Sequence, residues 1–227
     1  ADANSLDIIS QLTISLWLRA NTFPASTAYD NVLIKGNSTA QNYYLETFNN
    51  AGTNRIAFGF VNSGGTFQEL IGITTALSTS TWYHVVATFI DNGTTNDIRL
   101  YINATQQTES VTSGAPEGAN NLVANANTLR IGFTTAGEVF DGRIDEPRIS
   151  KTVRSSDWIT TEYNNQNSPS TFYALGAAEN VPVPPPPEPT PVVTLTINST
   201  NPSDGATGVA VTTTVSATFS MFVNGST

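Results

Sequence analysis

Residues 140–150, FDGRIDEPRIS, hold the densest group of reactive side chains in the chain. Two aspartates, a glutamate and two arginines fall within eight consecutive positions, although only 12% of all residues are charged. Paired carboxylates act as nucleophile and acid in glycoside hydrolysis, and clustered carboxylates bind calcium. The alternative is local ion pairing, which contributes about 1 kcal/mol at most for an exposed pair. The positions of Arg143 and Arg148, which flank Asp145 and Glu146, favour ion pairing.

Other catalytic side chains are scarce. His84 is the one histidine and the chain has no cysteine, which removes thiolate nucleophiles, disulfides and the usual zinc ligands. His84 lies inside the apolar run WYHVVATFI, on the same parity as Trp82 and Val86, and the sequence contains no G-x-S-x-G motif. We therefore expect a buried strand histidine and no nucleophilic triad.

The charge balance excludes two classes of partner. The chain carries 9 basic and 18 acidic residues, a net charge of -9, whereas nucleic-acid binding needs a basic surplus. The same charge opposes binding to an anionic membrane, and no apolar run is long enough to span a bilayer. Residues 1–10 lack the basic and apolar regions of a signal peptide and an initiating methionine. We expect a segment of a longer protein, with any signal peptide outside it.

Short β-branched and aromatic runs, separated by Gly, Asn, Asp and Ser clusters, are typical of an all-β sandwich or barrel. In LTISLWLR the apolar residues alternate with Thr, Ser, Trp and Arg, so one face of this strand should be buried. Asn92 and Gly93, both expected at positive φ, predict one tight turn, and NSGG at 62–65 predicts another. The predicted strands cover 12–19, 55–62, 68–75, 82–90, 97–103, 128–134 and 170–176.

The charged stretch is itself expected to kink. Phe140, Gly142 and Ile144 share one face of an extended chain, whereas Ile149 has the opposite parity. The strand must therefore slip by one residue between them. Pro147, which has no amide donor, suits a bulge or an edge at this point.

One segment has helical character. The sequence SSDWITTEYNN offers Ser155 or Ser156 as N-cap, Asp157 in the first turn, and Ile159 and Tyr163 four residues apart. We predict one short helix of two to three turns.

The composition changes sharply towards the C-terminus. Residues 181–191, VPVPPPPEPTP, carry seven prolines and should extend as polyproline II, roughly 30 Å long at about 3.1 Å per residue. Beyond them the sequence alternates again, with turn chemistry at NPSDG, and predicts two strands in a segment too short for its own core. We assign a β domain to residues 1–178, a proline-rich linker to 179–191 and a truncated second β domain to 192–227.

Four blocks of sequence resemble a known family. They are NSLDIISQLTISLWLRA, WYHVVATFIDNGTTNDIRLYIN, LRIGFTTAGEVFDGRIDEPRIS and VRSSDWITTEYNNQNSPSTFYALG, in this order over residues 4–176. Together they resemble the laminin G-like, concanavalin A-like jelly-roll domains of bacterial surface and secreted proteins. The resemblance implies a two-sheet antiparallel jelly-roll sandwich, with one short closing helix followed by a last strand. The tail resembles the start of a bacterial Ig-like domain.

The resemblance also bears on metal binding. Laminin G-like domains often hold one calcium at the rim of the sandwich, which implies one structural Ca²⁺ here. Asp145 and Asp141 on the kinked strand are the candidate ligands, and Asp91 and Asp97 beside the predicted hairpin turn come next. Local ion pairing is the alternative for these carboxylates, since no contiguous calcium-binding loop is present.

Catalysis is not expected. Jelly-roll glucanases, which share this sandwich, place their carboxylates on one strand in an E-x-D-x-x-E pattern. In RIDEPR, Arg143 and Arg148 stand where that pattern has its two glutamates. We therefore predict that the domain is not an enzyme.

Aromatic residues near loops are the candidates for a ligand site. Tyr43 and Tyr44 are adjacent, so one should face the core and the other should face outward, and Tyr29 and Phe67 lie beside predicted loops. Exposed rings stack on sugars, but the alternative that all four rings fill the core stays open. No ligand-binding residue is assigned from the sequence.

The sequence thus predicts a non-catalytic recognition module of a multidomain bacterial protein that is extracellular or on the cell surface. Its expected partner is a glycan or a surface protein, with neither nucleic-acid binding nor membrane insertion. One alternative is an architectural spacer of an adhesin with no ligand of its own. The other is an accessory module of a secreted polysaccharide-degrading enzyme.

Overall fold

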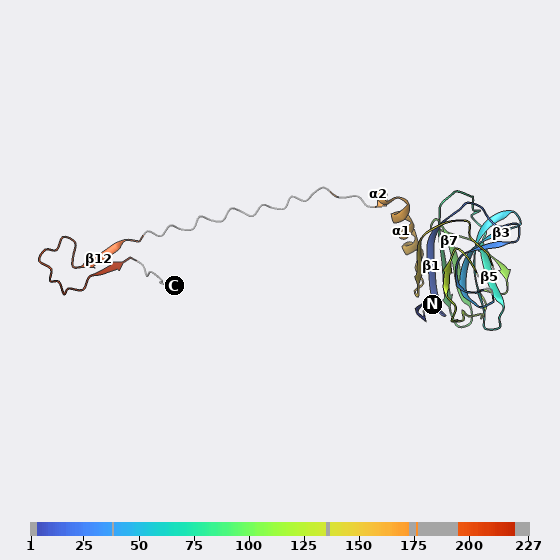
Figure 1. The fold of residues 1–227 in the computed structure, drawn as a ribbon, viewed down its shortest axis with the longest axis horizontal. Coiled ribbons are helices and arrows are strands. Elements are labelled where there is room, and N and C mark those ends of the chain that lie inside the picture. The colour runs from blue at the N-terminus through green and yellow to red at the C-terminus, as the bar shows by residue number, and fades with distance from the viewer. Residues whose placement is uncertain (1–3, 38, 135–136, 173–175, 177–194, 221–227) are drawn as a thin grey trace. The chain divides into compact units, whose positions relative to one another are not determined.

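The structure is a computed structural model that describes residues 4–37, 39–134, 137–172, 176 and 195–220. The chain divides into two compact units, Ala1–Leu175 and Gly176–Thr227, and each is described by itself (Figure 1). The predicted linker, 179–191, lies outside the described residues, so the domain boundaries and its polyproline conformation stay predictions. Within the described ranges, no helix combines the length and apolar character that crossing a membrane requires.

The first unit is a sandwich of two antiparallel sheets, which confirms the predicted fold class. Within the described residues, one sheet has five strands in the order β11-β1-β6-β7-β8, and the other has six in the order β10-β2-β3-β4-β5-β9. The five are β1 (Gln11–Ala20), β6 (Tyr83–Asp91), β7 (Asn96–Ile102), β8 (Thr105–Gln106) and β11 (Gly142–Ser150). The six are β2 (Tyr29–Gly36), β3 (Gln41–Asn50), β4 (Thr53–Val61), β5 (Phe67–Gly72), β9 (Glu109–Ser113) and β10 (Leu129–Ile131). A 3-10 turn, η1 (Asn4–Leu6), precedes them.

Apolar side chains from both sheets fill the space between them. The four apolar residues that alternate in LTISLWLR are all buried in this core, so the predicted pattern of β1 is confirmed. Phe60 of β4 and Phe89 of β6 meet edge to face across the core, with ring centroids 5.6 Å apart. Trp17 of β1 points the other way, to the outer face of the five-stranded sheet, where it lies against Tyr163.

β11 contains the predicted kink. At one point β1 advances by two residues while β11 advances by three, so a bulge inserts one residue beside Pro147. Ile144 and Ile149 therefore both pack against the core despite their opposite parity in the sequence. Glu146, within the bulge, has a φ of 50°. β11 is also the edge strand of its sheet.

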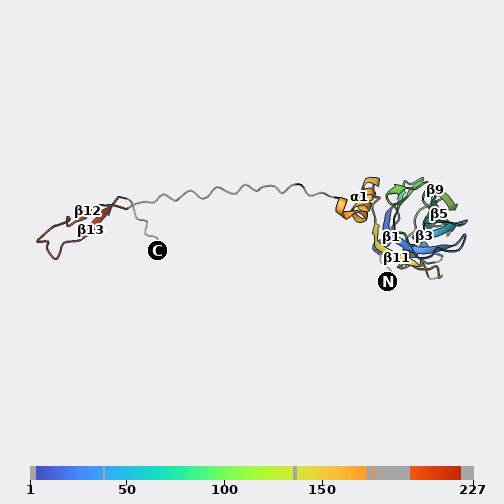
Figure 2. The same ribbon diagram turned by 90° about the horizontal axis from the view of Figure 1, so that it is seen from above.

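The predicted helix is α1 (Ser156–Asn167), slightly longer than expected, with Ser155 as its N-cap. It lies on the outer face of the five-stranded sheet, where Ile159 packs against Val86 and Tyr101. In Figures 1 and 2, α1 runs beside β1, on the side of the sandwich away from β3 and β5.

Two local predictions are wrong. The strand expected over 170–176 is helical where it is described, as α2 (Pro169–Phe172), while 173–175 lie outside the described residues. Proline suits the first position of a helix because that position needs no amide donor. At the hairpin between β6 and β7, Gly93 has a φ of 83° and Asn92 is not at positive φ. The turn at 62–65 is confirmed, with Gly65 donating to the carbonyl of Asn62 at 2.9 Å.

The second unit contains a two-stranded antiparallel sheet, β12 (Ile197–Asn201) and β13 (Ser216–Phe219). The two strands predicted for this segment are therefore confirmed. None of its described residues is buried, as expected of a piece too small to enclose a core. Its resemblance to an Ig-like domain stays a prediction.

Candidate functional site

The bulge of β11 forms one wall of an open cleft of about 600 Å³ on the outer face of the five-stranded sheet. We call it the helix-side cleft, because the last turn of α1 forms the opposite wall. Its lining includes Trp17, Trp82, Asp145, Glu146, Arg148 and the three consecutive amide side chains of residues 165–167. Part of the charged stretch, Asp145, Glu146 and Arg148, therefore lines a cavity.

The ion pairing predicted for this stretch holds for one arginine. Arg148 donates from Nη2 to the carboxylate of Glu146, and Asp145 Oδ1 accepts the backbone N–H of Glu146 at 2.9 Å. Arg143 has no carboxylate within ion-pair distance among the described residues, so its predicted pairing is wrong.

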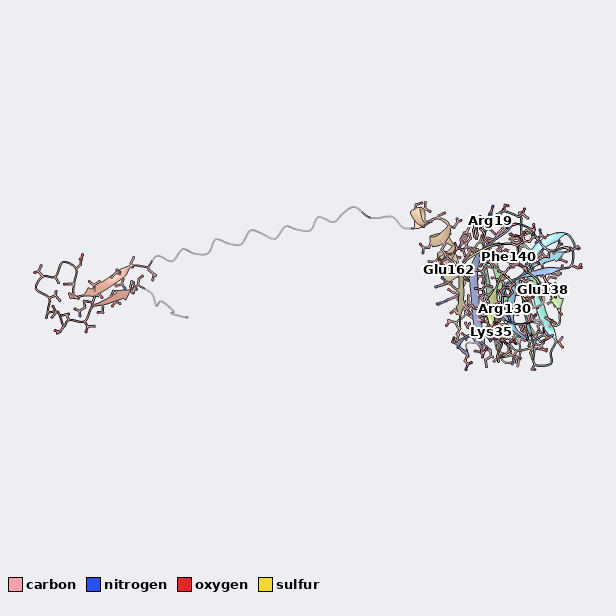
Figure 3. All side chains as sticks on the ribbon, in the orientation of Figure 1. Arg19, Lys35, Arg130, Glu138, Phe140 and Glu162 are labelled. Carbon is pink, nitrogen blue, oxygen red and sulfur yellow. The ribbon has the colours of Figure 1, made fainter. Side chains whose placement is uncertain are left out.

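A buried network fixes α1 to the sheet beneath the cleft. Glu162 of α1 accepts hydrogen bonds from Arg148 Nη1 and, at 3.3 Å, from Ser15 Oγ. His84 Nε2 lies 3.4 Å from the other carboxylate oxygen, and His84 is 1% exposed, which confirms a buried strand histidine. Burial raises the pKa of Glu162, but the hydrogen bonds from His84 and Arg148 outweigh it and hold the pKa below its ordinary value. Figure 3 shows Glu162 on the helix side of the sandwich.

The structure does not bring the two candidate calcium ligands together. Both carboxylate oxygens of Asp141 accept hydrogen bonds at 2.9 Å, from Asn21 Nδ2 and Thr22 Oγ1, and these lower its pKa. Asp145 lies four residues further along, roughly 13 Å at about 3.3 Å per residue. The described ranges contain no cluster of three or more His, Cys, Asp or Glu suited to a metal ion. Calcium binding at Asp141 or Asp145 stays a prediction.

Asp91 and Asp97 have local partners at the hairpin. Asp91 Oδ1 accepts the N–H of Gly93 at 2.6 Å, which stabilises the turn. Asp97 forms an ion pair with Arg99 at 3.0 Å on the surface. Both contacts are of the local kind that the sequence analysis gave as the alternative to a metal ligand.

The aromatic residues noted in the sequence converge on a second cavity, of about 310 Å³, on the outer face of the six-stranded sheet. Tyr43 is buried in the core and its neighbour Tyr44 lines this cavity, so their predicted divergence is confirmed. Tyr29 and Phe67, which are 44% and 40% exposed, also line it. We call it the outer-face pocket and define it by Tyr29, Tyr44, Glu46, Phe48, Phe67 and Glu69.

Two carboxyl groups meet at the floor of the outer-face pocket. Glu46 on β3 and Glu69 on β5 flank β4 and are hydrogen-bonded to each other. Gly59 of β4 has no side chain to separate them, and a Cβ there would lie 2.2 Å from Tyr44 Oη. The Tyr44 ring thus crosses β4 over Gly59, and its hydroxyl donates to Glu69 at 3.0 Å. Thr112 donates to the second oxygen of Glu69.

The surroundings of Glu46 favour its protonated form. Burial raises the pKa of Glu46 well above its ordinary value, and the neighbouring charge of Glu69 raises it further. Two carboxyl groups can share a hydrogen bond only when one of them is protonated. The floor of the pocket therefore holds a carboxyl group, that of Glu46, whose protonated form is favoured by its surroundings.

Further acidic groups surround the outer-face pocket. Burial raises the pKa of Tyr29, and nearby carboxylates, Glu138 first among them, raise it more. Burial likewise raises the pKa of Asp30, with added contributions from Asp141 and Glu138. Figure 3 places Glu138 on the side of the sandwich opposite to α1. The field at this pocket is negative, so it disfavours anionic ligands.

Glu46 and Glu69 were not evident as site residues from the sequence. The available signal was a lone acidic residue inside each of two largely apolar runs, YYLETF and FQELIG, because a charge buried in a strand needs a partner. Their meeting across β4 depends on the register of three strands, which the sequence alone did not provide.

Comparison with known proteins identifies the family. Residues 1–160 match the family model described as the concanavalin A-like lectin/glucanases superfamily. The chain therefore belongs to the concanavalin A-like lectin/glucanase superfamily. A search of curated proteins found no match to the chain. The family resemblance inferred from the sequence is confirmed for the sandwich.

Solved structures share the fold of this superfamily member at low identity. The binding domain of Paraclostridial Mosquitocidal Protein 1 is 15% identical with a TM-score of 0.51, covering 70% of this chain and 38% of that one. The botulinum neurotoxin serotype G binding domain is 11% identical with a TM-score of 0.48, covering 73% and 39%. A heptameric SAP-like pentraxin from Limulus polyphemus is 13% identical with a TM-score of 0.49, covering 69% and 71%. The chain thus spans about two fifths of the two binding domains. The similarity to the first of them, with a TM-score of 0.51, shows the fold alone.

Proposed function

We propose that the sandwich is a non-catalytic recognition module of a multidomain extracellular protein, and that the outer-face pocket binds a neutral carbohydrate. The observation that carries this proposal is the exposed pair of rings, Tyr29 and Phe67, beside a floor of hydrogen-bonding groups. Aromatic rings stack on the apolar faces of sugars, and a few fixed polar groups orient the ligand. Membership of a superfamily named for lectins and glucanases agrees with a sugar ligand.

The volume and charge of the pocket narrow the class of sugar. A volume of about 310 Å³ is at the small end for ligand sites, which suits one or two sugar rings. The carboxyl groups of Glu69, Asp30 and Glu138 around the pocket would repel sulfated, phosphorylated or uronic sugars. A neutral sugar avoids this repulsion, and its hydroxyl groups have acceptors to bind.

The contact between the two carboxyl groups supports a role without hydrolysis. Glycosidases hold their carboxyl groups about 5 to 10 Å apart, so that a sugar bond or a water fits between them. Glu46 and Glu69 are hydrogen-bonded to each other, which puts their oxygens within about 3 Å. In the helix-side cleft, Glu146 is similarly engaged by Arg148.

A glycan array followed by calorimetry tests the proposal. The intact chain is screened against neutral and anionic glycans, and the best ligand is titrated into wild type, Tyr29→Ala, Phe67→Ala and Tyr29→Phe. We expect neutral glycans to bind, the alanine variants to bind at least tenfold more weakly, and Tyr29→Phe to keep most of the affinity because the ring remains. Phe133→Ala is the matched control, since Phe133 is 47% exposed and is not among the residues that line either cavity.

Each contrary outcome selects a different function. Binding that survives both alanine substitutions would remove the sugar from the outer-face pocket. If no glycan on the array binds, an architectural spacer with no ligand would be favoured. Release of reducing sugar by wild type, lost in Glu69→Gln, would show an enzyme.

A further inference from the structure

We propose that the helix-side cleft is a second saccharide site, so that one sandwich holds two glycan chains on opposite faces. The cleft lies on the outer face of the five-stranded sheet and the outer-face pocket on that of the six-stranded sheet, with the core between them. In Figure 2, α1 lies beside the five-stranded sheet, away from β3 and β5. This inference goes beyond the proposed function, because the cleft can bind whether or not the outer-face pocket does.

The lining of the cleft combines an aromatic surface with groups that both donate and accept hydrogen bonds. Trp82 is 39% exposed at its rim, which leaves much of the side chain free to stack on a ligand. The carboxylate of Asp145 is an acceptor, and the side-chain amides of residues 165–167 supply donors and acceptors from the end of α1. A sugar hydroxyl donates and accepts at once, so this mixture matches a polyhydroxylated ligand.

The walls of the cleft are held in place before any ligand arrives. Trp17 Nε1 donates to Gln166 Oε1 at 2.5 Å, and the Trp17 ring stacks on Tyr163 with centroids 5.8 Å apart. Arg148 is fixed from two sides, by Glu146 on the bulge and by Glu162 on α1. Binding therefore costs little side-chain entropy at these positions.

Backbone strain at the bulge points to the same site. Glu146 has a φ of 50° and precedes Pro147, a left-handed conformation that is strained for a non-glycine residue. The strained residue and its neighbour Asp145 are the two carboxylates that line the cleft. Such strain persists where the surroundings enforce it, and it concentrates at binding and catalytic sites.

The charges of the cleft favour a neutral ligand over an ion. The guanidinium of Arg148 is already neutralised by Glu146 and Glu162, so it does not attract a free anion strongly. A cation could bind the carboxylate of Asp145, but the N–H donors of the side-chain amides and of Arg148 would not contact it favourably. A neutral saccharide uses both kinds of group.

Tryptophan fluorescence can locate binding at this cleft. Two of the three tryptophans of the chain, Trp17 and Trp82, line it, whereas the residues lining the outer-face pocket include none. The intact chain is titrated with neutral oligosaccharides of glucose, mannose, galactose and xylose while emission is recorded. We expect a saturable change in tryptophan emission with at least one of them.

Substitutions then separate the cleft from the outer-face pocket. Asp145→Ala keeps all three tryptophans and should weaken the emission response at least tenfold, and Trp82→Ala should weaken binding equally by calorimetry. Phe67→Ala, on the other face, should leave the emission response unchanged. Both Asp145 and Trp82 are exposed, so the variants should fold, and a melting temperature within about 2 °C of wild type checks this.

The outcomes decide the proposal independently of the outer-face pocket. It is overturned if no saccharide alters the emission, or if the response survives in Asp145→Ala. Loss of the response in Phe67→Ala alone would instead place the ligand on the six-stranded sheet. When both sites bind, calorimetry with a short oligosaccharide gives two ligands per wild-type chain and one in either single-site variant.

Discussion

Replacing Glu46 by glutamine removes one ionisable group from the carboxyl pair while keeping a hydrogen-bond donor toward Glu69. The folded protein raises the pKa of Glu46 well above the ordinary value of 4.5, mainly through burial and then through Glu69. A group whose folded pKa is raised makes the folded state bind a proton that the unfolded chain releases. The wild type is therefore stabilised below about pH 4.5 and loses this contribution as the pH rises toward the folded pKa. The Glu46→Gln variant should not lose this stability as the pH rises, because glutamine does not titrate.

The size of the effect follows from linkage. One proton retained by the folded state and lost by the unfolded chain changes the free energy of unfolding by about 1.4 kcal/mol per pH unit. The stability of Glu46→Gln minus that of wild type should therefore be near zero at pH 4.5 and grow by about 1.4 kcal/mol for each pH unit above it. The growth ends at the folded pKa of Glu46. With a urea m-value of about 2 kcal/mol/M, each pH unit separates the two midpoints by roughly 0.7 M.

Urea unfolding at half-unit intervals from pH 4.5 to 7.5 measures this difference. All three tryptophans, at positions 17, 82 and 158, belong to the sandwich unit, so their fluorescence reports its unfolding apart from that of the C-terminal unit. Taking the difference between variant and wild type cancels the other titrating groups.

A parallel pH dependence of wild type and Glu46→Gln would refute the raised pKa of Glu46 at the floor of the outer-face pocket. So would a variant that is less stable than wild type at pH 7. Glu117→Gln is the matched control, because the carboxylate of Glu117 is 47% exposed and Glu117 is not among the residues that line the outer-face pocket.

Two further predictions concern the other face and the rim. Glu162→Gln should destabilise the sandwich by about 1–3 kcal/mol at pH 7 through weakened bonds to Arg148 and His84. Because the folded pKa of Glu162 is lowered from 4.5, that deficit in urea midpoint should shrink as the pH falls below 4.5 toward the folded pKa. A deficit that does not shrink as the pH is lowered from 4.5 would contradict this account. If calcium binds at Asp141 or Asp145, adding it should raise the melting temperature by a few degrees, and a chelator should reverse the rise. An unchanged melting temperature in wild type, or an equal rise in the double variant Asp141→Asn, Asp145→Asn, would end the calcium prediction.

Local patterns predicted much of the sandwich. The parity change between Ile144 and Ile149 predicted the bulge at Pro147, because both residues had to reach one core. β2 and β3 were not predicted, because they are buried on both faces over most of their length and so lack the alternation that marks a half-exposed strand.

The candidate sites were harder to predict than the fold. Adjacency predicted that Tyr43 and Tyr44 diverge, and nearby turns marked Tyr29 and Phe67 as candidates, but the sequence left open whether these rings fill the core. The contact between Glu46 and Glu69 depends on long-range register across Gly59, and no local pattern carries that information. The helix-side cleft likewise needs the packing of α1 on the sheet, although the charged residues at its other wall were evident in the sequence.

The bulge in β11 also has a consequence for self-association. β11 borders its sheet, and a straight border strand with free amides invites another chain to extend the sheet, which is a common start to aggregation. Pro147 removes one amide, the inserted residue bends the strand, and the acidic and basic side chains around it oppose stacking of identical copies. The same irregularity that shapes a cavity should therefore help to keep neighbouring copies of this module from joining edge to edge when they are crowded together.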